Sequence, residues 1–122
     1  MKISIITATY NSGKTVGDTL KSVLAQTYHD YELLVVDGAS KDNTLEVVKK
    51  MEPLFDGRMR YISEPDKGIY DAMNKGIDLS VGHFLIFLNA GDTFASATTL
   101  ADIAKQVEGM KELHFGKEKH SM

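Results

Sequence analysis

Residues 32–44, ELLVVDGASKDNT, join an apolar run to a polar turn and the start of a helix. The run at 32–37 is rich in leucine and valine, which is typical of a strand buried on both faces of a sheet. Either Ser40 or Asp42 can cap the helix that follows, and the helix is expected to end before Pro53. This segment therefore predicts a strand–turn–helix unit of an α/β protein.

The same order of apolar run, turn and helical periodicity recurs along the rest of the chain. Apolar runs of strand length predict strands, and apolar residues at spacings of three and four predict helices. We expect strands at 3–8, 58–63, 83–88 and 112–116, and helices at about 14–26, at 69–79 and around Leu100, Ile103, Ala104 and Val107. Strands that alternate with helices form a parallel sheet, so we predict a Rossmann-like α/β fold with helices on both faces.

The segment 58–63, RMRYIS, differs from the other predicted strands because charged residues alternate with apolar ones. Such alternation leaves one face of the strand in water and is typical of the edge of a sheet. With this third strand outermost, the strand order becomes 3-2-1-4, and the direction of winding reverses between strands one and four. Ligands bind at such a reversal, beyond the carboxyl ends of the strands.

The composition narrows the class of protein. A chain of 122 residues favours one domain over 1–122, and 43% hydrophobic with 25% charged residues is ordinary for a globular protein. A formal net charge of -3 gives no reason to expect a nucleic acid as partner. Without cysteine there is no disulfide and no thiol chemistry, which fits a reducing cytoplasm. We expect a cytoplasmic protein, with peripheral attachment to the inner face of the membrane as an alternative.

Polar residues follow all four of the first strands. They are Thr9, Tyr10 and Asn11 after the first strand, Asp37 after the second, Asp66 and Lys67 after the third, and Asp92 after the fourth. Parallel strands bring these residues to one edge of the sheet, so the three carboxylates are expected around one crevice. A hard divalent cation that also holds substrate phosphates takes one or two protein carboxylates. A nucleotide diphosphate carried by Mg²⁺ or Mn²⁺ is therefore a reasonable ligand.

Two long segments resemble a known family. Residues 4–44, SIITATYNSGKTVGDTLKSVLAQTYHDYELLVVDGASKDNT, and residues 64–92, EPDKGIYDAMNKGIDLSVGHFLIFLNAGD, resemble the N-terminal half of family 2 glycosyltransferases, inverting enzymes of the GT-A fold. The resemblance implies a nucleotide-diphospho-sugar transferase that moves a sugar from a nucleotide-diphosphate sugar, commonly a UDP-sugar, to an acceptor hydroxyl. The acceptor of such an enzyme is a glycan or a lipid-linked molecule.

The resemblance also implies roles for single residues. Asp37 matches the position that contacts the base, and Thr9 and Tyr10, followed by Asn11, would line the base pocket. Asp66 and Lys67 would lie near the ribose and the diphosphate. Asp71 is on the helix that borders the donor pocket, and Asp92 matches the acid that holds the metal ion on the diphosphate.

This sequence departs from the family pattern in two places. Asn89, Ala90 and Gly91 supply no carboxylate where the metal-binding motif has an earlier acid, so the metal would rest mainly on Asp92, the diphosphate and water. Met73 stands where many members carry an arginine. Both departures bear on the identity of the donor and on metal affinity.

In the family, the general base and the acceptor site lie in the C-terminal half. We therefore expect this chain to be a C-terminally truncated, donor-binding half domain in which no catalytic base can be assigned. Robust sugar transfer by the isolated chain would contradict this. A sheet cut after the fifth strand can expose apolar surface, so we also expect a tendency to self-associate.

Structural explanations stand beside each functional one. Asp92 can cap the next helix, Asp37 and Asp66 can be turn formers, and Asp71 can pair with Lys75 one helical turn away. A nucleotidyltransferase would carry a more glycine-rich, basic loop after the first strand. A phosphoacceptor receiver domain would carry acids there. A third alternative is a module that binds nucleotide and catalyses nothing.

Overall fold

The computed structural model describes the backbone of residues 1–121 and the side chains of residues 1–110. Within this part the strands are β1 Ile3–Thr9, β2 Tyr31–Asp37, β3 Met59–Ser63 and β4 Phe84–Phe87. The α-helices are α1 Val16–Leu24, α2 Thr44–Met51, α3 Ile69–Leu79 and α4 Thr99–Ser121, and a short 3-10 helix, η1 Glu52–Phe55, follows α2. No helix in this part combines the length and the apolar character that a bilayer crossing needs.

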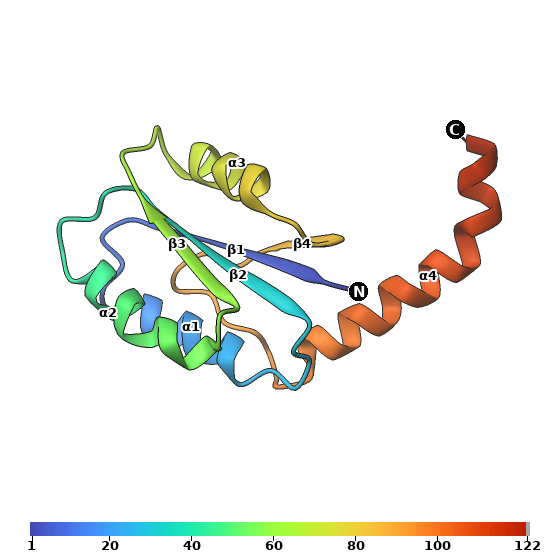
Figure 1. Cartoon of the computed structure of the whole chain (residues 1–122), viewed down its shortest axis with the longest axis horizontal. Coiled ribbons are helices and arrows are strands. Elements are labelled where there is room, and N and C mark those ends of the chain that lie inside the picture. The colour runs from blue at the N-terminus through green and yellow to red at the C-terminus, as the bar shows by residue number, and fades with distance from the viewer. Residues whose placement is uncertain (122) are drawn as a thin grey trace.

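The strands form one parallel sheet in the order β3-β2-β1-β4. Figure 1 shows α3 on one face of this sheet and α1 with α2 on the other. Thr9, Asp37 and Ser63 are register partners, so β1, β2 and β3 end on one line. The predicted α/β class, the strand order and the helices on both faces are confirmed.

The main core lies between the sheet and the α1–α2 layer. Ile5, Leu33 and Val35 point into it from β1 and β2, and Leu20 and Phe55 meet them from α1 and η1, all of them almost completely buried. Leu100 and Ala104 at the start of α4 join the same cluster. Burying one such aliphatic or aromatic side chain contributes roughly 1.5–3 kcal/mol, so this layer dominates the stability of the fold.

The helix α3 covers the opposite face through a close approach to the sheet. It packs on β1 and β2, and a Cβ added at Gly76 would collide with Cγ2 of Ile6. Only glycine leaves room for this contact, because a methyl group there would force the helix or Ile6 to move. The position of α3 matters for function because its first turn reaches the carboxyl ends of the strands.

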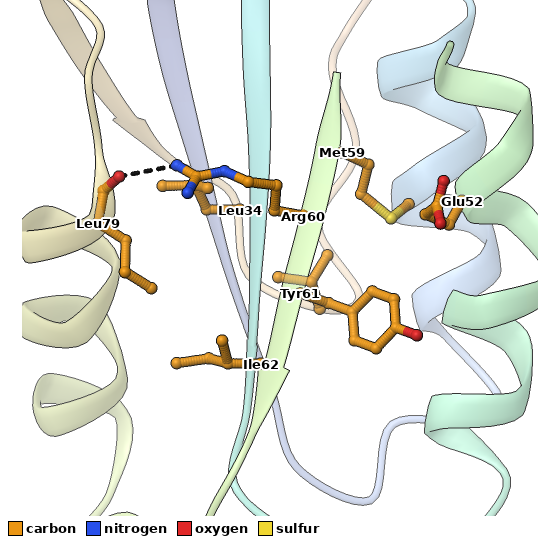
Figure 2. A pocket seen from close by; sticks show the side chains of 8 residues that line it. Leu34, Glu52, Met59, Arg60, Tyr61, Ile62 and Leu79 are labelled. Carbon is orange, nitrogen blue, oxygen red and sulfur yellow. Dashed lines mark hydrogen bonds between the residues drawn. The ribbon is translucent and has the colours of Figure 1, made fainter. Parts of the chain in front are cut away.

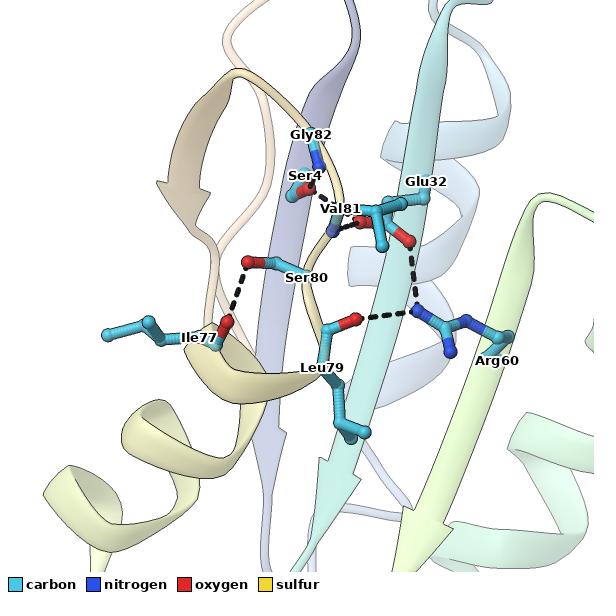
Figure 3. Close-up of polar contacts among 8 residues, drawn as sticks. All are labelled: Ser4, Glu32, Arg60, Ile77, Leu79, Ser80, Val81 and Gly82. Carbon is cyan, nitrogen blue, oxygen red and sulfur yellow. Dashed lines mark hydrogen bonds and ion pairs between the residues drawn. The ribbon is translucent and has the colours of Figure 1, made fainter.

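A polar network that is buried at Glu32 and exposed at Arg60 fixes the far end of α3 (Figure 3). The Glu32 carboxylate accepts hydrogen bonds from Ser4 Oγ at 2.6 Å, from the Val81 amide at 2.6 Å and from an Arg60 guanidinium nitrogen at 3.1 Å. Arg60 also donates to the Leu79 carbonyl at 2.8 Å. The network ties β1, β2 and β3 to the loop between α3 and β4. It also gives Arg60 a structural role, whereas the sequence indicated only that this residue faces solvent on an edge strand.

The fifth strand predicted at 112–116 is wrong. The helix α4 continues through this segment to Ser121. The prediction rested on five residues, ELHFG, and the residues just before them, Met110 and Lys111, favour helix continuation. A helix that has already begun adds residues at little cost, so a short apolar stretch does not interrupt it.

Candidate functional site

A cavity of about 590 Å³ lies beyond the carboxyl ends of β1 and β2, beside the point where the strand order reverses. It is bounded by the loops that follow β1 and β2 and by the segment that leads into α3. The residues that line it are Ala8, Thr9, Tyr10, Gly38, Ala39, Lys41, Pro65, Asp66, Gly68, Ile69 and Ala72. The cavity therefore occupies the place in the fold where a ligand was predicted.

The two loops on one side of the cavity are joined by hydrogen bonds around Asn11. The Asn11 amide donates to Ser40 Oγ at 2.8 Å, and its side-chain oxygen accepts from the Lys41 amide at 2.8 Å. Both Asn11 (φ 47°) and Ala39 (φ 61°) have left-handed backbone conformations. Asparagine tolerates this conformation, whereas alanine is strained there by about 1–2 kcal/mol. Such strain is concentrated at ligand sites.

Asp37 lies beneath the cavity and is completely buried. Its Oδ1 accepts from Thr9 Oγ1 at 2.6 Å and Ser40 Oγ at 2.5 Å, and its Oδ2 accepts from the Ser40 amide at 2.8 Å and Ser63 Oγ at 2.8 Å. Burial alone would raise the pKa of Asp37, but these four hydrogen bonds outweigh it and hold the pKa below its ordinary value. The carboxylate is ionised and ties three strand ends together.

Asp66 lies on the wall of the cavity and is half-buried. Its Oδ1 accepts from the Gly68 amide at 3.0 Å, an Asx turn that opens the way into α3. Its Oδ2 lies against the backbone of Gly38, where an added Cβ would be 2.8 Å from this oxygen. The absence of a side chain at Gly38 therefore makes room for the Asp66 carboxylate.

Lys67 and Asp71 are outside the cavity wall. The Lys67 amide donates to Asp71 Oδ2 at 3.0 Å, which caps the first turn of α3. Lys75 lies 3.7 Å from Asp71 and 3.1 Å from Glu64. Partial desolvation would lower the pKa of Lys75, but the hydrogen bond with Glu64 and the surrounding carboxylates raise it. The ion pair expected between Asp71 and Lys75 is present.

Asp92 lies in the turn after β4, and two earlier residues of this segment, Asn89 and Ala90, contact Ala8 of the cavity wall. The Asn89 side chain accepts from the Ala8 amide at 3.3 Å, and the Ala90 amide donates to the Ala8 carbonyl at 3.1 Å. The Asp92 amide closes a turn onto the Asn89 carbonyl at 2.9 Å, and the Asp92 side chain is exposed. Among the described residues no group of three potential metal-ligating side chains exists. An exposed single carboxylate fits a cation whose other ligands come from phosphate and water.

A second cavity, of about 410 Å³, follows the outer edge of β3. Figure 2 shows Leu34, Ile62 and Leu79 on the α3 side of this strand, and Met59 and Tyr61 on the side of α2. Its one cation, Arg60, is already engaged by Glu32 and the Leu79 carbonyl. This groove lies along the flank of the sheet, whereas the cavity at the strand ends gathers the polar side chains, so the latter is the candidate site.

The sequence matches the family model described as glycosyl transferase family 2 over residues 4–113. The chain belongs to glycosyltransferase family 2. It is 42% identical over 101 residues to a PGL/p-HBAD biosynthesis glycosyltransferase of Mycobacterium bovis, a match that covers 83% of this chain and 40% of the relative. It is 33% identical over 94 residues to an uncharacterized glycosyltransferase of Nostoc, covering 77% of this chain and 29% of that protein.

Solved glycosyltransferases share the fold of this family 2 chain. A crystal structure of Staphylococcus aureus TarS in complex with UDP-GlcNAc matches with a TM-score of 0.82 and 28% identity, over 89% of this chain and 32% of that one. The mannosyltransferase PcManGT of Pyrobaculum calidifontis, in complex with GDP-Man and Mn²⁺, matches with a TM-score of 0.78 and 26% identity, over 84% and 31%. The chain thus spans at most 40% of the length of these relatives.

The structure brings together some of the family 2 site residues predicted from the sequence. Thr9, Tyr10 and Asp66 line the cavity, whereas the four others lie behind or beside its wall: Asn11, Asp37, Lys67 and Asp71. Sequence reasoning missed Gly38, Ala39, Lys41, Ile69 and Ala72, which also line it. Apart from Lys41, these residues are small or apolar and carry no chemical signal, so only their positions just after a strand or at a helix start could have indicated them.

Proposed function

We propose that the chain is the donor-binding part of a glycosyltransferase that transfers a sugar from a UDP-sugar to a hydroxyl of a glycan or lipid-linked acceptor with inversion. The observation that carries this proposal is the cavity of about 590 Å³ at the strand ends of a family 2 chain. The complexes of TarS with UDP-GlcNAc and of PcManGT with GDP-Man support a nucleotide sugar as its ligand.

The cavity has the surfaces that a nucleotide needs. Tyr10 is 60% exposed and Ile69 is 48% exposed, so both offer apolar surface to a planar base. Lys41 lines the cavity and Lys67 is exposed beside it, and both can attract the negative charge of a diphosphate. Thr9 stays oriented because its hydroxyl is committed to Asp37. Asn11, Asp37 and Asp71 act in this proposal by holding the walls in place.

Asp92 is the residue that would hold Mg²⁺ or Mn²⁺. Its exposed carboxylate follows β4 in a turn whose Asn89 side chain bonds Ala8 of the cavity wall, and a hard cation accepts such a ligand together with phosphate oxygens and water. When bound, the cation would supply positive charge that stabilises the leaving diphosphate. Asn89 cannot share this role, because its side-chain oxygen already accepts the Ala8 amide.

The attack on the sugar requires a base that removes the proton of the acceptor hydroxyl. The site residues named above are assigned to binding the nucleotide sugar, and none of them is assigned as the catalytic base. The competing account is that these 122 residues alone bind the nucleotide and transfer nothing. Incubation of the chain with UDP-GlcNAc and a panel of glycan acceptors, with product detection by mass spectrometry, separates full transfer from binding alone.

We also propose that the isolated chain self-associates through β4. Within the described sheet this strand pairs only with β1, and Leu85 and Phe87 are 36% and 39% exposed. An edge strand without charge or proline readily pairs with another edge. We further propose that the protein is cytoplasmic, because a sequence without cysteine fits a reducing compartment.

Calorimetric titration of the chain with UDP in the presence of Mn²⁺ tests the donor-binding proposal. Binding supports it, and the absence of binding by any nucleotide diphosphate overturns it.

A further inference from the structure

Of the two carboxylates nearest the base side of the cavity, Asp66 lies on its wall and Asp37 lies beneath it. Asp37 is completely buried, and both of its oxygens already accept hydrogen bonds from Thr9, Ser40 and Ser63. A further donor from a ligand would have to displace one of these partners. Asp66 differs because Oδ1 holds the Asx turn to Gly68, while Oδ2 takes part in no hydrogen bond with the described residues.

The surroundings of Asp66 Oδ2 are those of a base-binding wall. The oxygen lies against Gly38, at the distance where a side chain on that residue would collide with it. Tyr10, Ala39 and Ile69 line the same cavity and provide apolar surface for a flat ring. A hydrogen-bond acceptor beside apolar surface is the arrangement by which proteins orient and select a small planar ligand.

We infer that Asp66, and not Asp37, recognises the nucleobase of the donor by accepting a hydrogen bond from its imide N–H. The inference rests on the proposed function, and it names the class of base: a uracil or thymine. These bases carry one imide N–H, which matches the single free carboxylate oxygen. Cytosine presents a ring-nitrogen lone pair at the same position, and that lone pair faces the negative charge of Asp66 unfavourably.

Gly38 acts in this arrangement as a positioning residue. A methyl group at this residue would lie 2.8 Å from Asp66 Oδ2, closer than carbon and oxygen approach without strain. The carboxylate sits at the end of a side chain, so it can turn away while the fold is kept. Gly38→Ala should therefore displace Asp66 from the cavity and weaken base recognition in the same direction as a change at Asp66.

The decisive experiment compares the dissociation constants of UDP and CDP for the wild-type chain and for Asp66→Asn, measured by calorimetry with Mn²⁺. Asparagine keeps the Asx turn to Gly68 and the shape of the side chain, so the variant folds. The wild type should prefer UDP by about tenfold or more, the scale of one hydrogen bond to a charged acceptor. In Asp66→Asn the preference for UDP should be lost, because the oxygen stays in the Asx turn and the NH₂ group takes the place of Oδ2, where it can donate to cytosine but cannot accept from uracil.

Two further arms make the test specific. UDP methylated at the imide nitrogen should lose the tenfold advantage on the wild type, because it has no N–H to donate to Asp66. Gly38→Ala should lower the UDP preference, and combining it with Asp66→Asn should give little additional loss, since both act on one contact. Asp78→Asn, a charge-matched change at the exposed far end of α3, should leave the preference as it is in the wild type.

The outcomes separate this inference from the proposed function. If UDP binds and Asp66→Asn retains the wild-type preference over CDP, Asp66 is only a turn former and the inference fails while donor binding stands. If Asp37→Asn removes the preference in a folded protein and Asp66→Asn does not, the base is read by Asp37. If the wild type binds no nucleotide diphosphate, the proposed function and this inference fail together.

Discussion

The hydroxyl of Thr9 donates a 2.6 Å hydrogen bond to Asp37, its register partner across the ends of β1 and β2. Ser63, the register partner of Asp37 on β3, donates to the other oxygen of the same carboxylate at 2.8 Å. One buried charge thus joins three parallel strands at the edge where the cavity opens. Asp37 supports the floor of the site, and the wall above it is formed by Gly38, Ala39 and Asp66.

Replacing Asp37 with asparagine should destabilise the fold. The amide has one oxygen to accept hydrogen bonds, whereas the carboxylate accepts from three hydroxyls and a main-chain amide, so some of these donors would face the NH₂ group instead. The cost of leaving buried polar groups unsatisfied is about 1–3 kcal/mol, and we expect the free energy of unfolding to fall by about that amount. Urea titration followed by circular dichroism measures it. Asp56→Asn, an exposed site, is the control, and equal stability of the two variants would contradict the role of Asp37.

The free energy of unfolding should fall on acidification, and both Asp37 and Glu32 should contribute to this fall. Burial would raise the pKa of each carboxyl group, but hydrogen bonds outweigh it and lower both pKa values. The donors to Asp37 are those named above, and the donors to Glu32 are Ser4, Val81 and Arg60. A lowered folded-state pKa gives stability above the unfolded value, near 4, that is lost as pH falls through the folded value. Unfolding free energies measured from pH 7 to pH 3 should therefore decline at the acid end. Asp37→Asn should decline less steeply, and an unchanged slope would refute the assignment.

Two glycine substitutions should have opposite effects on stability. Gly76→Ala places a methyl group onto Ile6 beneath α3, and overpacking of this kind costs roughly 1–3 kcal/mol. Gly109 lies in α4 with nothing within 4 Å of an added Cβ, so alanine there should stabilise the helix by about 0.5–1 kcal/mol. Thermal unfolding of both variants gives the comparison. A neutral Gly76→Ala would mean that α3 does not lie as close to β1 as the structure shows.

The self-association proposed for β4 should depend on concentration and on the exposed face of that strand. Sedimentation equilibrium should show oligomers of the wild type, and Leu85→Lys should shift them toward monomer because a charge opposes edge pairing. Leu54→Lys on η1 is the matched control, since Leu54 is 55% exposed and far from β4 in the chain. A wild type that stays monomeric at high concentration rules out this interface.

The sequence was sufficient for the fold because its signals are local and repeated. Continuous apolar runs marked β1, β2 and β4, and the alternation around Arg60 placed β3 at the edge. The prediction failed at 112–116, where five residues were too few to outweigh a helix already under way. It also gave no sign of Glu32, because a single acid at a strand start does not reveal that Ser4 and Arg60 will surround it.

The sequence predicted where the site lies in the fold better than it predicted which side chains face the ligand. Residues after parallel strands were expected around one crevice, and Thr9, Tyr10 and Asp66 are there. Whether a carboxylate faces the ligand or the protein depends on its neighbours in space, and Ser40 and Ser63 turn Asp37 inward. That difference between Asp37 and Asp66 lies in tertiary contacts that no spacing along the chain expresses.

Titration of the chain with UDP, GDP and dTDP, each with and without Mn²⁺, tests the central claim most directly. The account predicts that UDP binds best, that Mn²⁺ strengthens its binding, and that Asp92→Ala removes the effect of Mn²⁺ while the fold is kept. Asp102→Ala, another acid of the same region but within α4, should retain the effect. Binding without metal dependence, or a metal effect that survives in Asp92→Ala, would contradict the metal role of Asp92. No binding of any of the three nucleotides would contradict the assignment of the cavity as a donor site.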